Sequence, residues 1–181
     1  MKVLFWFAPL LLSSCATQTQ TKIRPELAGV YRAERSIEGA LAVGVSYPEF
    51  GTLVRQFSTE LLLARDQARF SPPAYDVTRV LNKYEDLLGM YKDSSTVWGF
   101  EIEHASVHTD AHDRYLSMIA EKYGVSQAIR QEPKAIGSYR YVETTADYET
   151  IRQAIWAQAA KLHEQEIAIV YGYPVERVKS K

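Results

Sequence analysis

Apolar side chains recur every three or four positions over most of the chain. This spacing is typical of amphipathic helices that bury one face. Prolines and glycines interrupt the pattern at several points and separate the periodic stretches. The pattern therefore predicts five helices, at about residues 29–44, 46–69, 74–105, 110–123 and 146–171.

The second and third of these helices have the most regular spacing. The second helix has apolar residues at every seventh position: Phe50, Phe57 and Ala64. Between them lie further apolar residues, Leu53, Val54, Leu61 and Ala68. The third helix repeats every seven residues at Val77, Tyr84, Tyr91 and Trp98. Its additional apolar positions are Leu81, Leu88 and Ile102. Because the phase is kept across Gly89 and Gly99, we expect the third helix to be continuous. Successive heptad patterns predict an antiparallel pair.

The other three helices have shorter apolar stripes. Their inward positions are Val30, Ile37 and Leu41 in the first, Tyr115, Ile119 and Tyr123 in the fourth, and Tyr148, Ile151, Ile155, Leu162, Ile169 and Tyr173 in the last. Gly44, Gly124 and Gly172 follow these stripes, and glycine commonly ends a helix. We predict an all-α fold: a four-helix-type bundle with one short extra helix, built from residues 29–174.

Residues 125–144 do not fit a long helix. A further helical turn is expected between Val125 and Arg130, and Pro133 and Gly137 predict a loop. The segment 138–143 is expected to be extended.

The first fifteen residues have the composition of a secretion signal. Met1-Lys2 is positively charged, the segment 3–12 is apolar, and Ser13 and Ser14 precede Cys15. This order of charged, apolar and small residues is that of a signal peptide. The apolar run is too short to span a bilayer, which needs roughly 20 residues.

The residues before the cysteine, Leu12-Ser13-Ser14-Cys15, resemble the lipobox of bacterial lipoproteins. The resemblance covers only these first fifteen residues. It implies cleavage before Cys15 and the attachment of fatty acyl chains, such as palmitate, that hold the protein on a membrane. Ala16 after the cysteine implies a place on the outer membrane, facing the periplasm. Residues 1–14 would then be the signal peptide and 15–28 a flexible tether.

Composition narrows the range of partners. The net charge is −1, so no nucleic-acid partner is expected. Residues 175–181 form a short basic tail. Cys15 is the only cysteine, which excludes an internal disulfide, and acylation explains a single cysteine in an oxidising compartment.

Three of the four histidines lie four residues apart, at His104, His108 and His112, and Glu101 precedes them. On a continuous helix they would share one face and could bind zinc or copper. Two features argue against this site. Thr109-Asp110 favours a helix start that would break the stripe, and the second Glu-x-x-His of a di-iron bundle is missing. The alternative is a polar junction at a helix C-terminus, where a charged histidine is favourable.

Two tryptophans, Trp98 and Trp156, are candidates for binding a partner protein, because exposed tryptophan is a common anchor at interfaces. The alternative is that the aromatic row Tyr84, Tyr91 and Trp98 packs in the core.

The sequence has no Gly-x-Ser-x-Gly elbow and no glycine-rich phosphate loop. We therefore expect a non-catalytic, membrane-anchored lipoprotein that acts through contacts with an envelope protein, as an accessory, inhibitor or immunity protein. The alternatives are a periplasmic metal-binding protein and an enzyme of unknown class.

Overall fold

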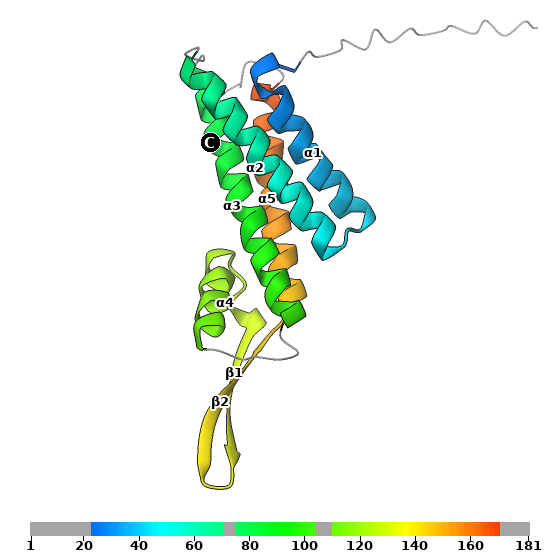
Figure 1. Cartoon of the computed structure of the whole chain (residues 1–181). Helices are drawn as coiled ribbons and strands as arrows, with labels where there is room; N and C mark the ends of the chain where they lie inside the picture. Colours follow the sequence, from blue (N-terminus) through cyan, green and yellow to red (C-terminus); the bar gives the residue numbers. More distant parts are fainter. Residues whose placement is uncertain (1–22, 71–74, 104–109, 171–181) are drawn as a thin grey trace, which may run out of the picture.

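The computed structural model describes residues 23–70, 75–103 and 110–170, and it confirms the predicted all-α class (Figure 1). Prediction and structure agree to within one or two residues at most helix ends. The elements in chain order are η1 (Pro25–Leu27), α1 (Ala28–Val43), α2 (Tyr47–Phe70), α3 (Tyr75–Glu103), α4 (Asp110–Lys122), η2 (Ser126–Ala128), β1 (Ile129–Ile136), β2 (Tyr139–Ala146) and α5 (Tyr148–Val170).

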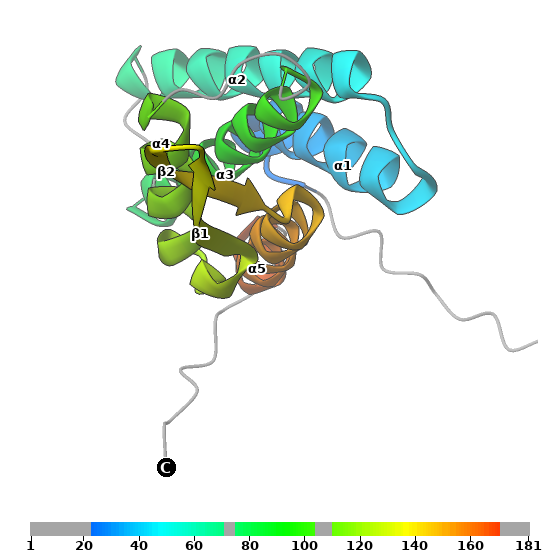
Figure 2. The same cartoon turned by 90° about the horizontal axis from the view of Figure 1, so that it is seen from below.

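Four helices, α1, α2, α3 and α5, form an antiparallel bundle in which each runs opposite to the one before it (Figure 1). The pair α3 and α5 makes the most extensive contact between helices. The fifth helix, α4, and the β1–β2 hairpin are inserted between α3 and α5. Seen from below, this insertion lies on the opposite side of the molecule from α1 (Figure 2).

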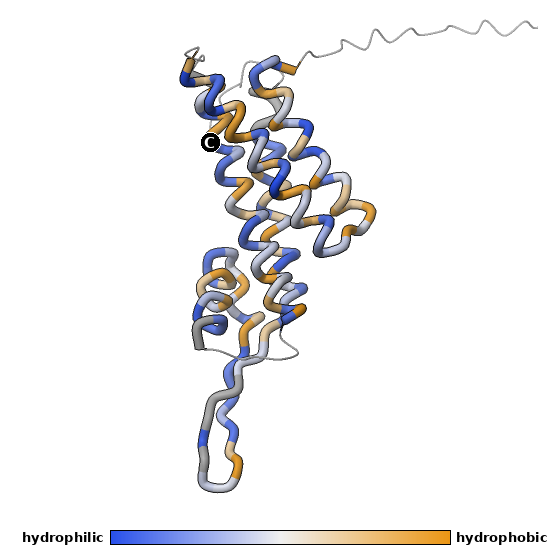
Figure 3. Tube along the Cα trace, viewed as in Figure 1, coloured by the Kyte–Doolittle hydropathy of each residue, from blue (hydrophilic) through white to orange (hydrophobic). Residues whose placement is uncertain are grey.

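The heptad positions of α2 and α3 form the larger core. The ring of Phe57 meets the rings of Tyr84 and Tyr91 edge-on, with centroids 5.9 and 6.1 Å apart. Phe50 also meets Tyr91 edge-on at 6.3 Å. Each such pair contributes about 0.5–1.5 kcal/mol beyond the burial of its area. The hydropathy of the chain alternates along these helices as the sequence predicts (Figure 3).

A second core holds α4 against the far ends of α3 and α5. Its fully buried members come from all three helices and include Val97, Leu116, Ile119, Ile151 and Ile155. The helical stripe of α4 therefore has a partner surface, although α4 lies outside the bundle.

The prediction for Ile102 is wrong: its side chain is 54 % exposed near the end of α3. Heptad spacing gives the direction of a side chain, but it does not show whether another element covers it.

Glycine ends two helices where the sequence predicts it. Gly44 follows α1 with φ +92°, and Gly124 follows α4 with φ +72°. These conformations are strained for residues with a Cβ. The fourth helix is described from Asp110, and Thr109 lies outside the described residues.

The loop predicted around Pro133 is wrong. Residues 129–136 form a strand that pairs antiparallel with 139–146, and Gly137, with φ +63°, lies in the two-residue turn between them. Pro133 is paired with Val142 in this ladder. A two-stranded hairpin consists only of edge strands, and an edge position tolerates the missing N–H of proline.

Candidate functional site

The β1–β2 hairpin, which we call the arm, projects from one end of the bundle (Figure 1). Every residue of β1 after Ile129 is exposed. At about 3.3 Å per residue, strands of eight residues extend roughly 26 Å. A two-stranded hairpin alone is marginally stable in water. The arm is therefore an element whose stability would gain from a partner.

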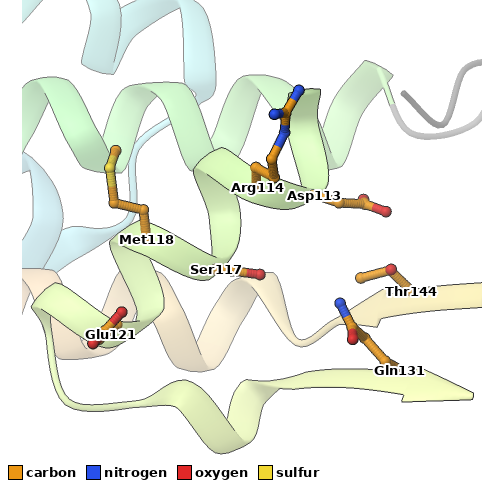
Figure 4. Close-up of a pocket in the computed structure, with 7 residues that line it drawn as sticks. All are labelled: Asp113, Arg114, Ser117, Met118, Glu121, Gln131 and Thr144. Carbon is orange, nitrogen blue, oxygen red and sulfur yellow. The ribbon is translucent and has the colours of Figure 1, made fainter. Parts of the chain in front are cut away.

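An open groove lies where the arm joins α4 (Figure 4). It encloses about 750 Å³ and is lined by five residues of α4 and two of the arm: Asp113, Arg114, Ser117, Met118 and Glu121, with Gln131 and Thr144. The lining combines both signs of charge with hydroxyl and amide groups. Such a surface offers hydrogen bonds to a polypeptide passing over the base of the arm.

The arm and the start of the described chain lie at opposite ends of the molecule. The short helix η1 lies at the same end of the bundle as the start of α3, whereas the arm extends beyond the end of α3 (Figure 1). The 29 residues of α3 span roughly 44 Å at 1.5 Å per residue. The start of the described chain is therefore separated from the arm by the length of the bundle.

A second candidate lies inside the bundle, where two charged side chains are buried together. Glu34 of α1 has no exposed surface, and His163 of α5 is 4 % exposed. Nδ1 of His163 lies 2.9 Å from Oε2 of Glu34. Burying a charged group is costly unless an oppositely charged group or a metal is close by.

Glu38 lies one helical turn after Glu34 and completes the cluster. Its Oε2 is 3.7 Å from Nε2 of His163, and it also pairs with Arg35. Burial and the neighbouring charge of Glu34 raise the pKa of Glu38. Burial lowers the pKa of His163, but the hydrogen bond and charge of Glu34, together with Glu38, outweigh this and raise it.

Two tyrosines border the cluster. Tyr91 of α3 donates a hydrogen bond of 3.3 Å to Oε1 of Glu34. Burial and the charge of Glu34 raise the pKa of Tyr91 far above its ordinary value, so the phenol remains a donor. The ring of Tyr31 stacks on the imidazole of His163, with centroids 6.4 Å apart. The cluster is thus held by three helices: α1, α3 and α5.

The sequence contains a signal for this cluster that the helical stripes above leave out. Glu34 falls between Val30 and Ile37 at the same spacing, so a charged residue occupies a core position of α1. His163 follows Ile155 by two turns on the buried face of α5. A charge inside an apolar stripe predicts a buried partner, but the sequence does not show which helix supplies it.

The predicted histidine cluster is described only in part. His104 and His108 lie outside the described residues. The ring of His112, in α4, lies against Phe100 with centroids 4.3 Å apart. Glu101 pairs with Arg152 of α5, which also pairs with Glu149. In the described part of the chain, Glu101 therefore pairs with an arginine.

Trp98 and Trp156 belong to an aromatic layer between α2, α3 and α5. Their rings are 6.1 Å apart, and both also contact Phe50. Nε1 of Trp156 donates a hydrogen bond of 2.7 Å to Oγ of Ser94, and the guanidinium of Arg152 lies 5.0 Å from the ring centre of Trp98. Both tryptophans are half-buried. Trp98 packs against the larger core and Trp156 against the second core.

Cys15 precedes the described residues, so the anchor predicted there stays a prediction. Among the helices described, none is both long enough and apolar enough to cross a bilayer. Comparisons with models of protein families, with curated proteins and with solved structures find no match to this chain.

Proposed function

We propose that the protein is a non-catalytic lipoprotein, anchored through acylated Cys15 to the outer membrane and facing the periplasm. In this proposal its helical domain acts by contact with another envelope protein, and the arm carries that contact. The lipobox-like residues Leu12-Ser13-Ser14-Cys15 support the anchor.

The arm lies at the opposite end of the bundle from η1, where the described chain begins, and this placement supports the proposal (Figure 1). A lipid anchor before Ile23 would hold the near end at the membrane. The α3–α5 pair would then present the arm at a distance from it. Since α3 spans roughly 44 Å, the tip of the arm would be clear of the lipid headgroups.

The backbone of the arm favours a partner that adds a strand. Pairs in an antiparallel hairpin alternate between hydrogen-bonded and non-hydrogen-bonded, starting from the hydrogen-bonded pair Ile136–Tyr139 at the two-residue turn. Pro133 therefore falls in a non-hydrogen-bonded pair, and its nitrogen faces the outer edge of β1. This edge lacks one donor. The outer edge of β2, which contains no proline, is the better site for strand addition.

Site-specific photo-crosslinking in intact cells tests the proposal. A photoreactive amino acid replaces Ile136, which is 70 % exposed near the tip of the arm. The matched control carries the same residue at Leu63, an exposed apolar position on α2. We expect a discrete protein adduct from position 136 that position 63 does not form.

Equal adducts from both positions would contradict the arm as the contact surface. A lack of any adduct at position 136, in cells that carry the protein on the membrane, would also contradict it. A screen for turnover of envelope substrates addresses the alternative of an enzyme.

A further inference from the structure

Glu34, Glu38 and His163 bring one imidazole and two carboxylates together inside the bundle. Each residue offers one donor atom, and these three atoms lie within 4.8 Å of one another. In a tetrahedral zinc site with bonds of about 2.0–2.1 Å, donor atoms are roughly 3.4 Å apart. A small inward movement of side chains would close the observed spacing onto one ion.

The cluster differs from a group of surface carboxylates, because it is buried and one of its nitrogen atoms lacks a hydrogen-bond partner. Nε2 of His163 has no hydrogen bond within the described part of the chain, whereas Oε2 of Glu34 lies 2.9 Å from Nδ1 of the same ring. Both residues are more than nine-tenths buried. Nε2 of His163 faces Glu38 at 3.7 Å, which is too long for a hydrogen bond. Buried polar groups normally have a hydrogen-bond partner, so the unpartnered Nε2 of His163 is a candidate metal ligand.

We propose that Glu34, Glu38 and His163 bind a single divalent transition-metal ion, with Zn²⁺ as the fitting species. Mixed imidazole and carboxylate donors suit zinc, whereas magnesium and calcium prefer oxygen donors only. Three protein ligands leave one tetrahedral position for a water molecule. This site is independent of the arm, and it differs from the His104, His108 and His112 cluster.

The surroundings of the cluster are consistent with this site. The phenol of Tyr91 hydrogen-bonds Glu34 and would fix the orientation of a ligating carboxylate. Tyr31 stacks on His163 and limits rotation of its ring. Glu38 is only half-buried, so an ion would enter on its side. Arg35, which now pairs with Glu38, is exposed and can turn to solvent.

The test uses the full chain as the cell makes it, purified in detergent without a polyhistidine tag and stripped of metal with a chelator. Binding of Zn²⁺ is measured by isothermal titration calorimetry. We expect one ion per chain. Glu38→Gln and His163→Gln should each weaken binding at least tenfold, while Glu164→Gln, on the exposed face of α5, leaves it unchanged.

A triple variant, His104→Ala, His108→Ala and His112→Ala, separates the two candidate sites. Retained binding in this variant supports the Glu34–Glu38–His163 site, and lost binding overturns it. Absence of Zn²⁺ binding by the wild-type chain would also overturn it. Because His163→Gln can disturb folding, NMR of the imidazole nitrogens in the wild-type chain provides a second readout. Zn²⁺ must shift the resonances of His163, and no shift there rejects the site.

Discussion

Nδ1 of His163 lies 2.9 Å from Oε2 of Glu34, in the interior of a four-helix bundle and between helices at opposite ends of the sequence. This contact joins the first helix of the bundle to the last. It therefore links the two helices of the bundle that flank the α2–α3 pair in the sequence. The pairing is specific, because neither charge could be buried without the other.

Removing one member of this pair should be costlier than removing both. In metal-free buffer, we expect His163→Leu to lower the free energy of unfolding by about 3 kcal/mol, because Glu34 is left buried without its positive partner. The double variant Glu34→Leu/His163→Leu should recover most of this loss. Urea denaturation followed by circular dichroism measures both. If the two substitutions simply add, the residues are not coupled and the interpretation fails.

The hydrogen bond from Trp156 to Ser94 should make a measurable contribution to stability. Ser94 is fully buried, and its Oγ accepts from the indole at 2.7 Å. Ser94→Ala leaves the indole N–H without a partner, and we expect a loss of about 1–2 kcal/mol. Ser95→Ala is the control on the same helix. Urea denaturation followed by tryptophan fluorescence distinguishes them, and equal losses would argue against a role for this bond.

Acid should weaken the start of α5. The backbone N–H and hydroxyl of Thr150 donate to Asp147 at 3.0 and 2.7 Å. These bonds lower the pKa of Asp147 below its ordinary value of 3.8. A depressed carboxylate pKa adds stability that is present above pH 3.8 and is lost as the pH falls through the folded-state value.

The substitution Asp147→Asn separates the charge from the cap. Asparagine caps helices about as well as aspartate and does not titrate. We expect Asp147→Asn to remain near wild-type stability at pH 7 and to lose less stability than the wild type below pH 4. Thermal unfolding across this range measures the difference. Parallel curves for the two proteins would show that Asp147 does not contribute to the acid response.

The distal part of the arm should be dispensable for folding. Replacing residues 133–142 with Asn-Gly joins Glu132 to Glu143, which by the same alternation form a hydrogen-bonded pair, through a two-residue turn that suits a hairpin. Because β1 is exposed from residue 130 onward, we expect the melting temperature to change by no more than a few degrees. A large loss, measured by differential scanning calorimetry, would mean that the arm supports the bundle rather than a partner.

The sequence predicts the helices well because burial in a bundle follows the helical period. Phe50, Phe57, Tyr84 and Tyr91 all lie in the core, where their spacing places them. The hairpin does not follow from the sequence in the same way. The residues of β1 after Ile129 are all exposed, so no alternation of buried apolar and exposed polar residues marks this strand. Pro133 also favours a loop unless its strand is an edge.

The buried cluster shows a second limit of sequence interpretation. The apolar stripe of α1 is interrupted by Glu34, and that interruption can be read directly. The partner cannot, because His163 is distant in sequence and only the packing of α1 against α5 brings the two together. The cluster at His104, His108 and His112 can be proposed from the sequence because its residues are only four positions apart. Its first two histidines lie outside the described residues.

In the proposed function, this bundle is held on a membrane by its N-terminal end, with the arm directed away. This is tested by mass spectrometry of the intact protein, purified from the membranes of a bacterium with an inner and an outer membrane. We expect a chain that begins at Cys15 and carries acyl chains, and we expect Cys15→Ser to abolish both the added mass and the membrane association. A free thiol at Cys15, or residues 1–14 still attached, would contradict it.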